Sequence, residues 1–376
     1  MKNLFEIRDE IDRIDKQIVQ LYEQRMVLVG EVAEYKITTG KQVLDKTREQ
    51  EKLAYLTSLA TSDFTKMGVH ELFEQIIAMS RKKQYQLLRE HGKVASTGFE
   101  MIEQLDYKHA KIVYQGVEGA YSQLAMKTYF GEEIDGYHVD TWNDAMEAIL
   151  NGDADFAVLP IENSSAGIVS ENFDLLVAYQ NYIVGEQTIK ISHALLGLPG
   201  SGLEDITCVY SHPQALMQCV DFLDEHKHWE RVGTQNTAGA AKKILEDGLK
   251  HQAAIASRLT AEIYGLELLK ENINYSNENS TRFIIVSNKK ICRKQARKIS
   301  ICFELPHESG TLYQMLSHFI YNNLNMNKIE SRPIKDKSFA YRFFIDFEGN
   351  LAESAVQNAL QGLKEESLNL KILGNY

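Results

Sequence analysis

Apolar side chains recur every three or four positions through residues 1–91, a spacing that predicts helices. The first stripe of such residues contains Leu4, Ile7, Ile11, Ile14, Ile18, Leu21, Leu28, Val32 and Tyr35. It stops at Gly40, and a glycine just past the last turn is a common helix end. Two further helices are predicted, over residues 47 to about 59 and residues 63 to about 89, with Asp63 placed to cap the last. An all-helical domain with one very long first helix is therefore expected.

Beyond residue 110 the pattern changes to short apolar runs separated by helical stretches. KIVYQG precedes YSQLAMKTYF, TCVYS precedes PQALMQCVDFL, and AAIAS precedes LTAEIYGL. Strands that alternate with helices are typical of an α/β sheet, which we predict for residues 111–290. Over residues 298–376 the predicted order is βαββαβ, that of a small ferredoxin-like α+β domain. Residues 92–110 are small and polar and are predicted to be a linker, so the fold is multidomain.

One position in the apolar stripe of the first helix carries a charge. A step of four from Leu21 reaches Arg25, and a charge on a packing face costs free energy unless it is paired. Arg25 can lay its stem along this face and keep its head in solvent. The alternative is a buried anion site, which further polar residues of the helical domain favour: Arg8, Lys36, Asp45, Arg48, Glu49, Ser80 and Gln84. Arginine suits a ligand with carboxylates because its fork binds them through two hydrogen bonds.

Arg8 and Arg25 are too far apart to bind one small ligand from a single helix. A helix rises about 1.5 Å per residue, so these two positions lie about 25 Å apart. If Arg8 serves the same kind of site, it must reach a site on a second chain. We therefore predict a homodimer in which the first helices exchange ends.

Four strings in residues 1–91 resemble the all-helical class of chorismate mutase: EIRDEIDRIDKQIVQLYEQR, EVAEYK, VLDKTREQE and FEQIIAMSRKKQ. The resemblance implies that the two carboxylates of chorismate are bound by Arg8 of the partner subunit, Arg25 and Arg48. It implies that the ether oxygen is contacted by Lys36 and Gln84. The region of the ring hydroxyl and second carboxylate is then held by Asp45, Glu49 and Ser80.

The residue types suit the reaction that the resemblance implies. Conversion of chorismate to prephenate is a pericyclic rearrangement, so it needs no nucleophile, general base, metal or cofactor. Holding the reactive conformer and stabilising charge on the breaking C–O bond are what accelerate it. Gln84 donates to the ether oxygen without titrating, whereas a glutamate there would have to be protonated. No acid-only activity is therefore expected.

Three turns in residues 111–290 precede predicted helices, at residues 116–122, 211–214 and 236–239. Ser211 is placed to cap its helix, and Pro213 lies near the first turn. Each turn alone is more often a simple cap. Three helix N-termini in one α/β unit favour a small anionic ligand, because their free N–H groups bind anions. The first turn lacks the GxGxxG pattern of dinucleotide-binding proteins.

Together the strings GVEGAYS, DFAVLPIENSSAGIV, YSHPQAL, NTAGAA and AAIAS, with the signature Thr281-Arg282-Phe283, resemble prephenate dehydratase. The resemblance implies two α/β lobes that enclose a cleft, similar to a periplasmic binding protein. The family's catalytic threonine matches Thr281. Other active-site positions match Glu162, Asn163, Ser211 and Gln218, and Arg282 lies in the same signature.

Prephenate dehydratase removes carbon dioxide and hydroxide from prephenate to give phenylpyruvate, and aromatisation drives the reaction. A threonine hydroxyl is a weak acid, so Thr281 is expected to hydrogen-bond or relay a proton to the leaving hydroxyl. Glu162 is an alternative proton donor if burial raises its pKa. The residues alone leave the choice between Thr281 and Glu162 open.

Residues 298–376 resemble an ACT domain, a module that binds amino acids at dimer interfaces. The family's phenylalanine-binding element matches Glu330, Ser331, Arg332 and Pro333. Its usual Gly-Ala-Leu reads Gly310, Thr311, Leu312 here, so the hydroxyl of Thr311 bears on the identity and affinity of the effector. The resemblance implies feedback inhibition by phenylalanine and a second dimer contact, with a tetramer as the alternative to a dimer.

Composition excludes several other classes of protein. The formal net charge of −11 disfavours nucleic acid as a partner, because phosphate binding needs a basic surface. The 4 cysteines form no CxxC pair and no zinc-site spacing, so no metal is predicted. No apolar run approaches the length of a membrane span, and the N-terminus lacks the apolar core of a signal peptide. A cytoplasmic enzyme is expected.

Two alternatives compete with an enzyme that has two active sites and one regulatory site. An amino-acid sensor would keep the α/β unit as a binding module without turnover, which the presence of Glu162, Asn163, Ser211, Gln218 and Thr281 disfavours. A mutase fused to prephenate dehydrogenase would need a glycine-rich NAD loop and a downstream acidic residue, and neither is found.

Overall fold

The computed structural model describes the chain except residues 1–2, 93–95, 277, 309, 336 and 338. It divides into two compact units. The first unit combines Met1–Thr97 with Ile301–Leu370, and the second combines Gly98–Ser300 with Lys371–Tyr376. Each unit therefore contains segments that are distant in sequence.

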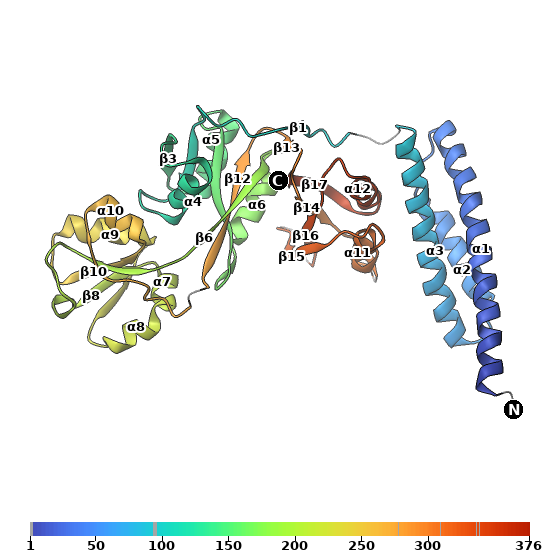
Figure 1. Cartoon of the computed structure of the whole chain (residues 1–376), viewed down its shortest axis with the longest axis horizontal. Coiled ribbons are helices and arrows are strands. Elements are labelled where there is room, and N and C mark those ends of the chain that lie inside the picture. Colours follow the sequence, from blue (N-terminus) through green and yellow to red (C-terminus); the bar gives the residue numbers. More distant parts are fainter. Residues whose placement is uncertain (1–2, 93–95, 277, 309, 336, 338) are drawn as a thin grey trace. The chain divides into compact units, whose positions relative to one another are not determined.

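The N-terminal part of the first unit consists of three helices, α1 (Leu4–Thr39), α2 (Lys46–Ser58) and α3 (Asp63–Glu90) (Figure 1). α1 ends at Gly40, which has a φ of 71° as the left-handed cap position requires. The prediction that Asp63 caps α3 is wrong. Ser62 is the cap, because its backbone is extended and its side chain accepts the N–H of Thr65, whereas Asp63 is already helical.

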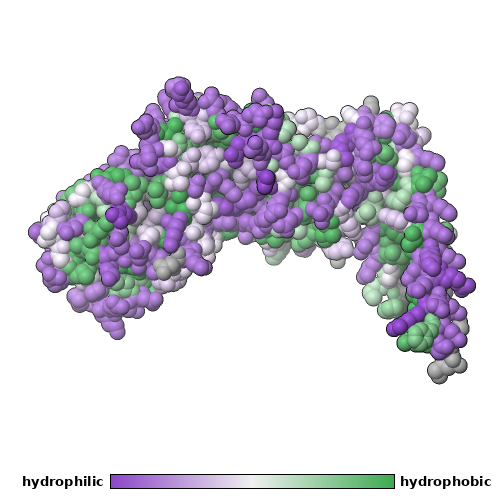
Figure 2. Space-filling model, in the orientation of Figure 1, coloured by the Kyte–Doolittle hydropathy of each residue, from purple (hydrophilic) through white to green (hydrophobic). Residues whose placement is uncertain are grey.

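The long apolar stripe of α1 lies on the surface of this single chain. All of its predicted members are exposed, among them Ile14 and Ile18 at 50% each. A different, narrower face of α1 is buried, through Val29 and Ala33. Apolar surface is visible among the polar residues of these helices in Figure 2. A stripe of this length outside any core is unusual for a monomer.

Residues 298–376 have the predicted order βαββαβ, and Ile301–Leu370 of this segment belong to the first unit. The elements of the segment are β14 (Lys298–Glu304), α11 (Thr311–Tyr321), β15 (Met326–Pro333), β16 (Tyr341–Glu348), α12 (Ser354–Glu366) and β17 (Leu368–Asn375). The strands lie in the order β15-β16-β14-β17, and α11 packs beside α12. Phe319 of α11 meets Phe347 of β16 edge to face in the core. β15 pairs with β16 antiparallel and lies at the end of the sheet order, which makes it an edge strand.

The first lobe of the second unit is an α/β sheet. Its sheet order is β6-β12-β4-β2-β3, and its elements are β2 (Ile112–Gln115), α4 (Tyr121–Phe130), β3 (Gly136–Val139), α5 (Trp142–Asn151), β4 (Phe156–Asn163), β5 (Gly167–Ile168), α6 (Ser170–Ala178), β6 (Tyr182–Lys190) and β12 (Ser280–Ser287). β2, β3 and β4 are parallel, whereas β12 is antiparallel to both β4 and β6. Ile112, Phe156 and Ile285 belong to its buried core.

The second lobe of this unit is a separate sheet in the order β11-β7-β10-β8-β9. Its elements are β7 (Ala194–Gly197), a short 3₁₀ helix (Leu203–Asp205), β8 (Cys208–Ser211), α7 (Pro213–Gln218), α8 (Val220–Glu225), β9 (Glu230–Gly233), α9 (Thr237–Asp247), β10 (Gln252–Ala256), α10 (Arg258–Tyr264) and β11 (Glu267–Lys270). The string PQALMQCVDFL was predicted as one helix, but Cys219 separates α7 from α8. The alanine-rich strand β10 is buried throughout.

Two chain segments connect the lobes, one after β6 and one before β12 (Figure 1). They run side by side, because Ile191 N–H donates to the Asn279 carbonyl at 2.8 Å and Ile273 N–H donates to the His193 carbonyl at 3.0 Å. The segment 92–110, predicted as a linker, also contains a short strand, β1 (Glu100–Ile102). It pairs in parallel with β13 (Ile291–Arg293).

Candidate active sites

The predicted dehydratase residues Asn163 and Thr281 face each other on adjacent antiparallel strands, β4 and β12. The Asn163 side-chain amide donates to the Thr281 hydroxyl oxygen at 2.9 Å and to the side-chain oxygen of Asn279 at 2.8 Å. It also lies 3.2 Å from the Ser280 carbonyl. The Thr281 oxygen thus accepts a hydrogen bond, which leaves its own O–H to serve as a donor.

Glu162 and Arg282 form the neighbouring pair in the same strand register. Arg282 Nε lies 3.0 Å from Glu162 Oε1, and its Nη1 lies 3.1 Å from Glu186 Oε2. A guanidinium partner stabilises the ionised carboxylate, which is a proton acceptor and not a donor. The strand register thus places the ion-paired Glu162 next to the Asn163–Thr281 pair. Glu186 was not predicted, because its role depends on β6 pairing with β12.

The other two predicted dehydratase residues belong to the second lobe. Ser211 is buried at the end of β8, and its hydroxyl donates to the Ile255 carbonyl at 2.7 Å. The prediction that Ser211 caps the following helix is wrong, because the cap of α7 is His212, which accepts from the Gln214 N–H. Pro213 does occupy the first turn, as predicted.

The contacts of Gln218 reveal two further residues, His193 and Tyr121, that were not predicted from the sequence. Its Oε1 lies 3.0 Å from Nε2 of His193, and the other ring nitrogen, Nδ1, lies 3.2 Å from the Tyr121 hydroxyl. Burial lowers the pKa of His193, so the ring is neutral near pH 7. Tyr121 lies in the string GVEGAYS but was not singled out as a site residue, and His193 belongs to none of the strings because it lies between two strands.

Both groups of predicted dehydratase residues border the chain segment that connects β11 to β12. Asn279, a partner of Asn163, lies at its end, and the Tyr275 N–H of this segment donates to the Gln218 carbonyl at 2.8 Å. His193, which contacts Gln218, lies on the second connection. The candidate dehydratase site therefore lies where the lobes join, a usual place for a ligand site in an α/β protein.

The candidate mutase site lies between α1, α2 and α3. Arg25 donates to the Ser80 hydroxyl, and the Gln84 amide donates to the Ser80 carbonyl at 3.2 Å. Burial lowers the pKa of Arg25, although a guanidinium stays charged at any physiological pH. Arg25 therefore does not keep its head in solvent; it points into the helical domain as the anion-site alternative requires.

Lys36, Asp45 and Glu49 form the second part of this site. Lys36 Nζ donates to the Val43 carbonyl at 2.6 Å, and burial lowers its pKa while Glu49 and Asp45 oppose that change. Asp45 caps α2 by accepting the Arg48 N–H at 3.1 Å. Burial raises the pKa of Glu49, although Arg81 and Lys36 counteract it. The carboxylate and the ammonium are thus close enough to influence each other's charge.

Two predicted mutase residues stand apart from this group. Arg48 is exposed at the start of α2, and Arg8 is exposed in the first turns of α1, far along the helix from Arg25. A single chain therefore does not bring Arg8 to the site that contains Arg25.

The predicted effector residues fall into two separate places. Thr311 and Leu312 line a cavity of about 100 Å³ together with Phe339 and Tyr341. The Thr311 hydroxyl lies 3.2 Å from the Pro306 carbonyl and 3.0 Å from that of Glu308, so it is engaged within its own turn. The residues Glu330, Ser331, Arg332 and Pro333 lie on the edge strand β15 and do not line this cavity.

Among the described residues, none of the helices combines the length and apolar character that crossing a membrane requires.

Comparison with known proteins places both catalytic segments. Residues 7–85 match the family model of chorismate mutase type II, and residues 112–291 match that of prephenate dehydratase. The bifunctional chorismate mutase/prephenate dehydratase of Enterobacter agglomerans is 33% identical over 99% of this chain and 95% of its own length. Arogenate dehydratase 3 of Arabidopsis thaliana is 39% identical over 71% of this chain and 66% of its own length.

A solved structure gives the same answer for the second catalytic segment. Prephenate dehydratase of Arthrobacter aurescens, in complex with L-Phe, is 32% identical and has a TM-score of 0.66. The match covers 71% of this chain and 89% of that one. Because a full-length relative is 33% identical over 99% of this chain and two family models match its catalytic segments, the chain belongs to the bifunctional chorismate mutase/prephenate dehydratases.

Proposed function

We propose that this enzyme rearranges chorismate to prephenate in residues 1–91 and converts prephenate to phenylpyruvate in residues 111–290. Residues 92–110 connect the two, and residues 298–376 form an ACT domain that binds phenylalanine and inhibits the enzyme. The observation that carries the second activity is the hydrogen bond from Asn163 to Thr281.

In the dehydratase site, Thr281 donates its hydroxyl hydrogen to the departing hydroxide of prephenate. Asn163 supports this role because it occupies a lone pair of the Thr281 oxygen and so orients the O–H away from itself. Glu162 is less suited to donate a proton, because its ion pair with Arg282 favours the carboxylate. Ser211, Gln218 and Arg282 complete the site by holding the substrate and its charges in place.

In the mutase site, cations and neutral donors hold chorismate in its reactive conformer. Arg25, Arg48 and Arg8 of the partner subunit bind the carboxylates, while Lys36 and Gln84 stabilise charge on the ether oxygen. Asp45, Glu49 and Ser80 hold the ring hydroxyl and the second carboxylate region. The grouping of Arg25, Ser80 and Gln84 supports this proposal.

The mutase site is completed by a second chain in a homodimer. Two observations support this: the apolar stripe of α1 is exposed in the single chain, and Arg8 is remote from Arg25. Exchange of the long first helices buries the stripe and delivers Arg8 at once. The edge strand β15, which carries the residues 330–333, gives the ACT domains a second place to pair and allows a tetramer.

Phenylalanine is proposed as the effector, in agreement with the L-Phe complex of the Arthrobacter aurescens relative. Its site comprises Gly310, Thr311 and Leu312 of one ACT domain and residues 330–333, brought together between two copies. The 4 cysteines are all buried free thiols, which suits the reducing cytoplasm.

The proposal is tested by incubating the enzyme with chorismate, without metal or nucleotide, and following chorismate, prephenate and phenylpyruvate together. Phenylpyruvate that forms after chorismate is lost supports both activities, and its suppression by phenylalanine supports the ACT assignment. Arogenate supplied in place of prephenate tests the choice of substrate. Prephenate that accumulates without phenylpyruvate would contradict the dehydratase assignment.

A further inference from the structure

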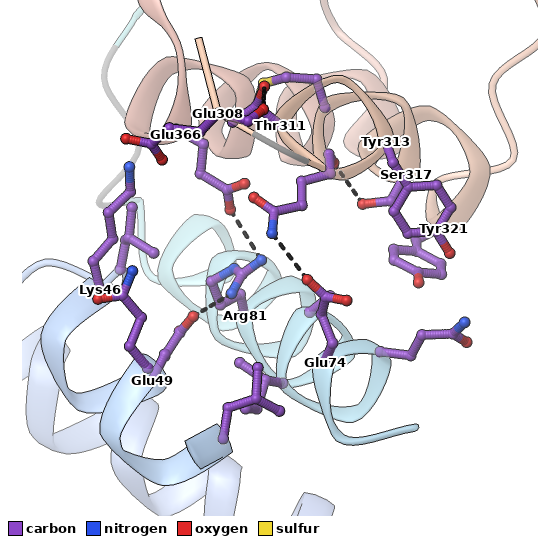
Figure 3. Close-up of a pocket in the computed structure, with 18 of the residues that line it drawn as sticks. Lys46, Glu49, Glu74, Arg81, Glu308, Thr311, Tyr313, Ser317, Tyr321 and Glu366 are labelled. Atoms are coloured by element: carbon purple, nitrogen blue, oxygen red, sulfur yellow. Dashed lines mark hydrogen bonds and ion pairs between the residues drawn. The ribbon is translucent and has the colours of Figure 1, made fainter. Parts of the chain in front are cut away.

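Arg81 of α3 connects the candidate mutase site to the C-terminal βαββαβ segment of the same unit. Its Nη1 lies 2.5 Å from Glu49 Oε2 on α2, and its Nη2 lies 3.0 Å from Glu366 Oε1 on α12. Figure 3 shows the guanidinium between these two carboxylates. The sequence alone predicts no role for Arg81 in the reaction, although Arg81 directly follows Ser80.

These charges are largely withdrawn from solvent, so their geometry matters. The side chains of Arg81 and Glu366 are 12% and 7% exposed, and that of Glu49 is 25% exposed. Removing one member of such a group leaves its partner's charge buried and unpaired, which is costly. The arrangement is therefore a rigid link and not a loose surface ion pair.

Glu366 is itself held in position from a second side. Its other oxygen, Oε2, lies 3.3 Å from His318 Nε2 on α11. Burial opposes ionisation of Glu366, but its contact with His318 and the charge of Arg81 outweigh burial and leave its pKa lowered. Glu366 is consequently a fixed anion that holds one end of the Arg81 fork while the other end reaches Glu49.

We propose that Arg81 is a positioning residue of the mutase site, which orients the Glu49 carboxylate toward the substrate and is itself fixed by Glu366 of α12. This inference rests on the proposed role of Glu49. With Oε2 bound to Arg81, Oε1 of Glu49 faces the ring hydroxyl of chorismate as an acceptor. The C-terminal segment thus contributes to mutase catalysis without touching the substrate.

Other contacts show that α12 meets the mutase helices at a defined register. Glu365 Oε2 accepts the Tyr85 hydroxyl at 2.6 Å and the Leu44 N–H at 3.1 Å, next to the start of α2. Arg89 donates to the Asn358 side-chain oxygen at 3.0 Å. Gln314 of α11 donates to Glu74 of α3 at 2.9 Å. A movement of α12 would therefore be transmitted to Arg81.

The test compares Arg81→Met, Arg81→Lys, Glu366→Gln and Glu49→Gln in the full-length enzyme. Arg89→Met is the matched control, because Arg89 also joins α3 to α12 but contacts no proposed mutase residue. Mutase kcat/KM is measured with chorismate, and dehydratase turnover with prephenate reports on folding. We expect Arg81→Met to lower mutase kcat/KM about tenfold or more, Glu366→Gln to lower it less, and Arg81→Lys to recover part of the loss.

The pH profile separates positioning from mere stability. The charged groups near Glu49 are Arg81 on α3, Lys36 on α1 and Glu366 on α12. Without Arg81 the pKa of Glu49 rises further, so the acidic limb of mutase kcat/KM moves to higher pH. This shift should be absent in Arg89→Met. Because Arg81 and Glu366 contact each other, the effects of Arg81→Met and Glu366→Gln on mutase kcat/KM should be non-additive in the double variant.

Three results would overturn the inference. If Arg81→Met matches Arg89→Met in kcat/KM and pH profile, Arg81 only stabilises the interface. If Arg81→Met also loses dehydratase turnover and Arg81→Lys is fully normal in mutase activity and pH profile, the effect is on folding. If Glu49→Gln is neutral, the role of Glu49 fails as well, which identifies an error in the proposed mutase site.

Discussion

The side-chain amide of Asn163 donates to the hydroxyl oxygen of Thr281 across strands β4 and β12, over 2.9 Å. The two residues are 118 positions apart in the chain. This contact joins the end of β4 to the start of β12, and so two of the strings that resemble prephenate dehydratase. The Thr281 oxygen accepts from Asn163, which leaves the Thr281 O–H able to donate.

Replacement of Thr281 with alanine removes this hydroxyl and should lower dehydratase turnover about a hundredfold or more, in the range of a lost general acid. Thr281→Ser keeps the hydroxyl and should retain most of the activity. The mutase site lies elsewhere, so chorismate consumption should be unchanged and prephenate should accumulate. Near-normal phenylpyruvate formation by Thr281→Ala would rule out this role.

Replacement of Gln84 with glutamate should make mutase activity depend on acid. Gln84 is buried, and a carboxyl group there donates to the ether oxygen only when it is protonated. Burial raises the pKa of the new carboxyl, so activity should be lost as pH rises through that value. Mutase rates from acidic to neutral pH check this, with wild type expected to lack the transition. A variant as active at neutral pH as wild type would contradict the contact.

Mixing two inactive variants tests the exchange of first helices. Arg8→Met and Arg25→Met should each abolish mutase activity alone. After co-refolding, mixed dimers hold one site with both substitutions and one intact site, so about a quarter of wild-type activity should return. No recovery, despite mixed dimers shown by mass spectrometry, would mean that Arg8 and Arg25 serve the same site from one chain. Normal activity of Arg8→Met alone would mean that Arg8 has no role.

A charge in the exposed stripe of α1 should separate the subunits and remove mutase activity. Ile14→Asp places an unpaired carboxylate in the proposed helix interface, which is costly on burial. The control is Lys16→Glu, an equally exposed position outside the stripe. Sedimentation should show a smaller species for Ile14→Asp only, with dehydratase turnover retained. An unchanged oligomer would place the subunit contact elsewhere.

Protonation of His193 should destabilise the second unit. Because burial lowers its pKa in the folded protein below the ordinary value of 6.5, the unfolded state binds the proton more tightly. Its contribution to stability is thus complete above about pH 6.5 and declines as pH falls toward the folded-state pKa. Thermal midpoints across this interval should fall less steeply for His193→Gln than for wild type. His251→Gln, at an exposed position of the same unit, should keep the wild-type slope.

Local patterns in the chain were enough to predict most element types and the βαββαβ order, whereas the candidate site residues came mainly from the resemblance of motif strings to known families. Periodicity constrains a helix or strand within a few residues of itself, and the motif strings supply residue types that suit the chemistry. Errors arose where two neighbours compete for one backbone role: Ser62 rather than Asp63 caps α3, and His212 rather than Ser211 caps α7. Backbone conformation decides such cases.

Long-range packing accounts for what the pattern did not predict. The register of β4 against β12 places Asn163 on Thr281, and the pairing of β6 with β12 adds Glu186 beside Arg282. Arg81 has no distinctive local signal, since its partners Glu49 and Glu366 come from other helices. Such contacts arise only when distant segments pack together, because hydrogen bonds and ion pairs depend on distances in space and not on spacing along the chain.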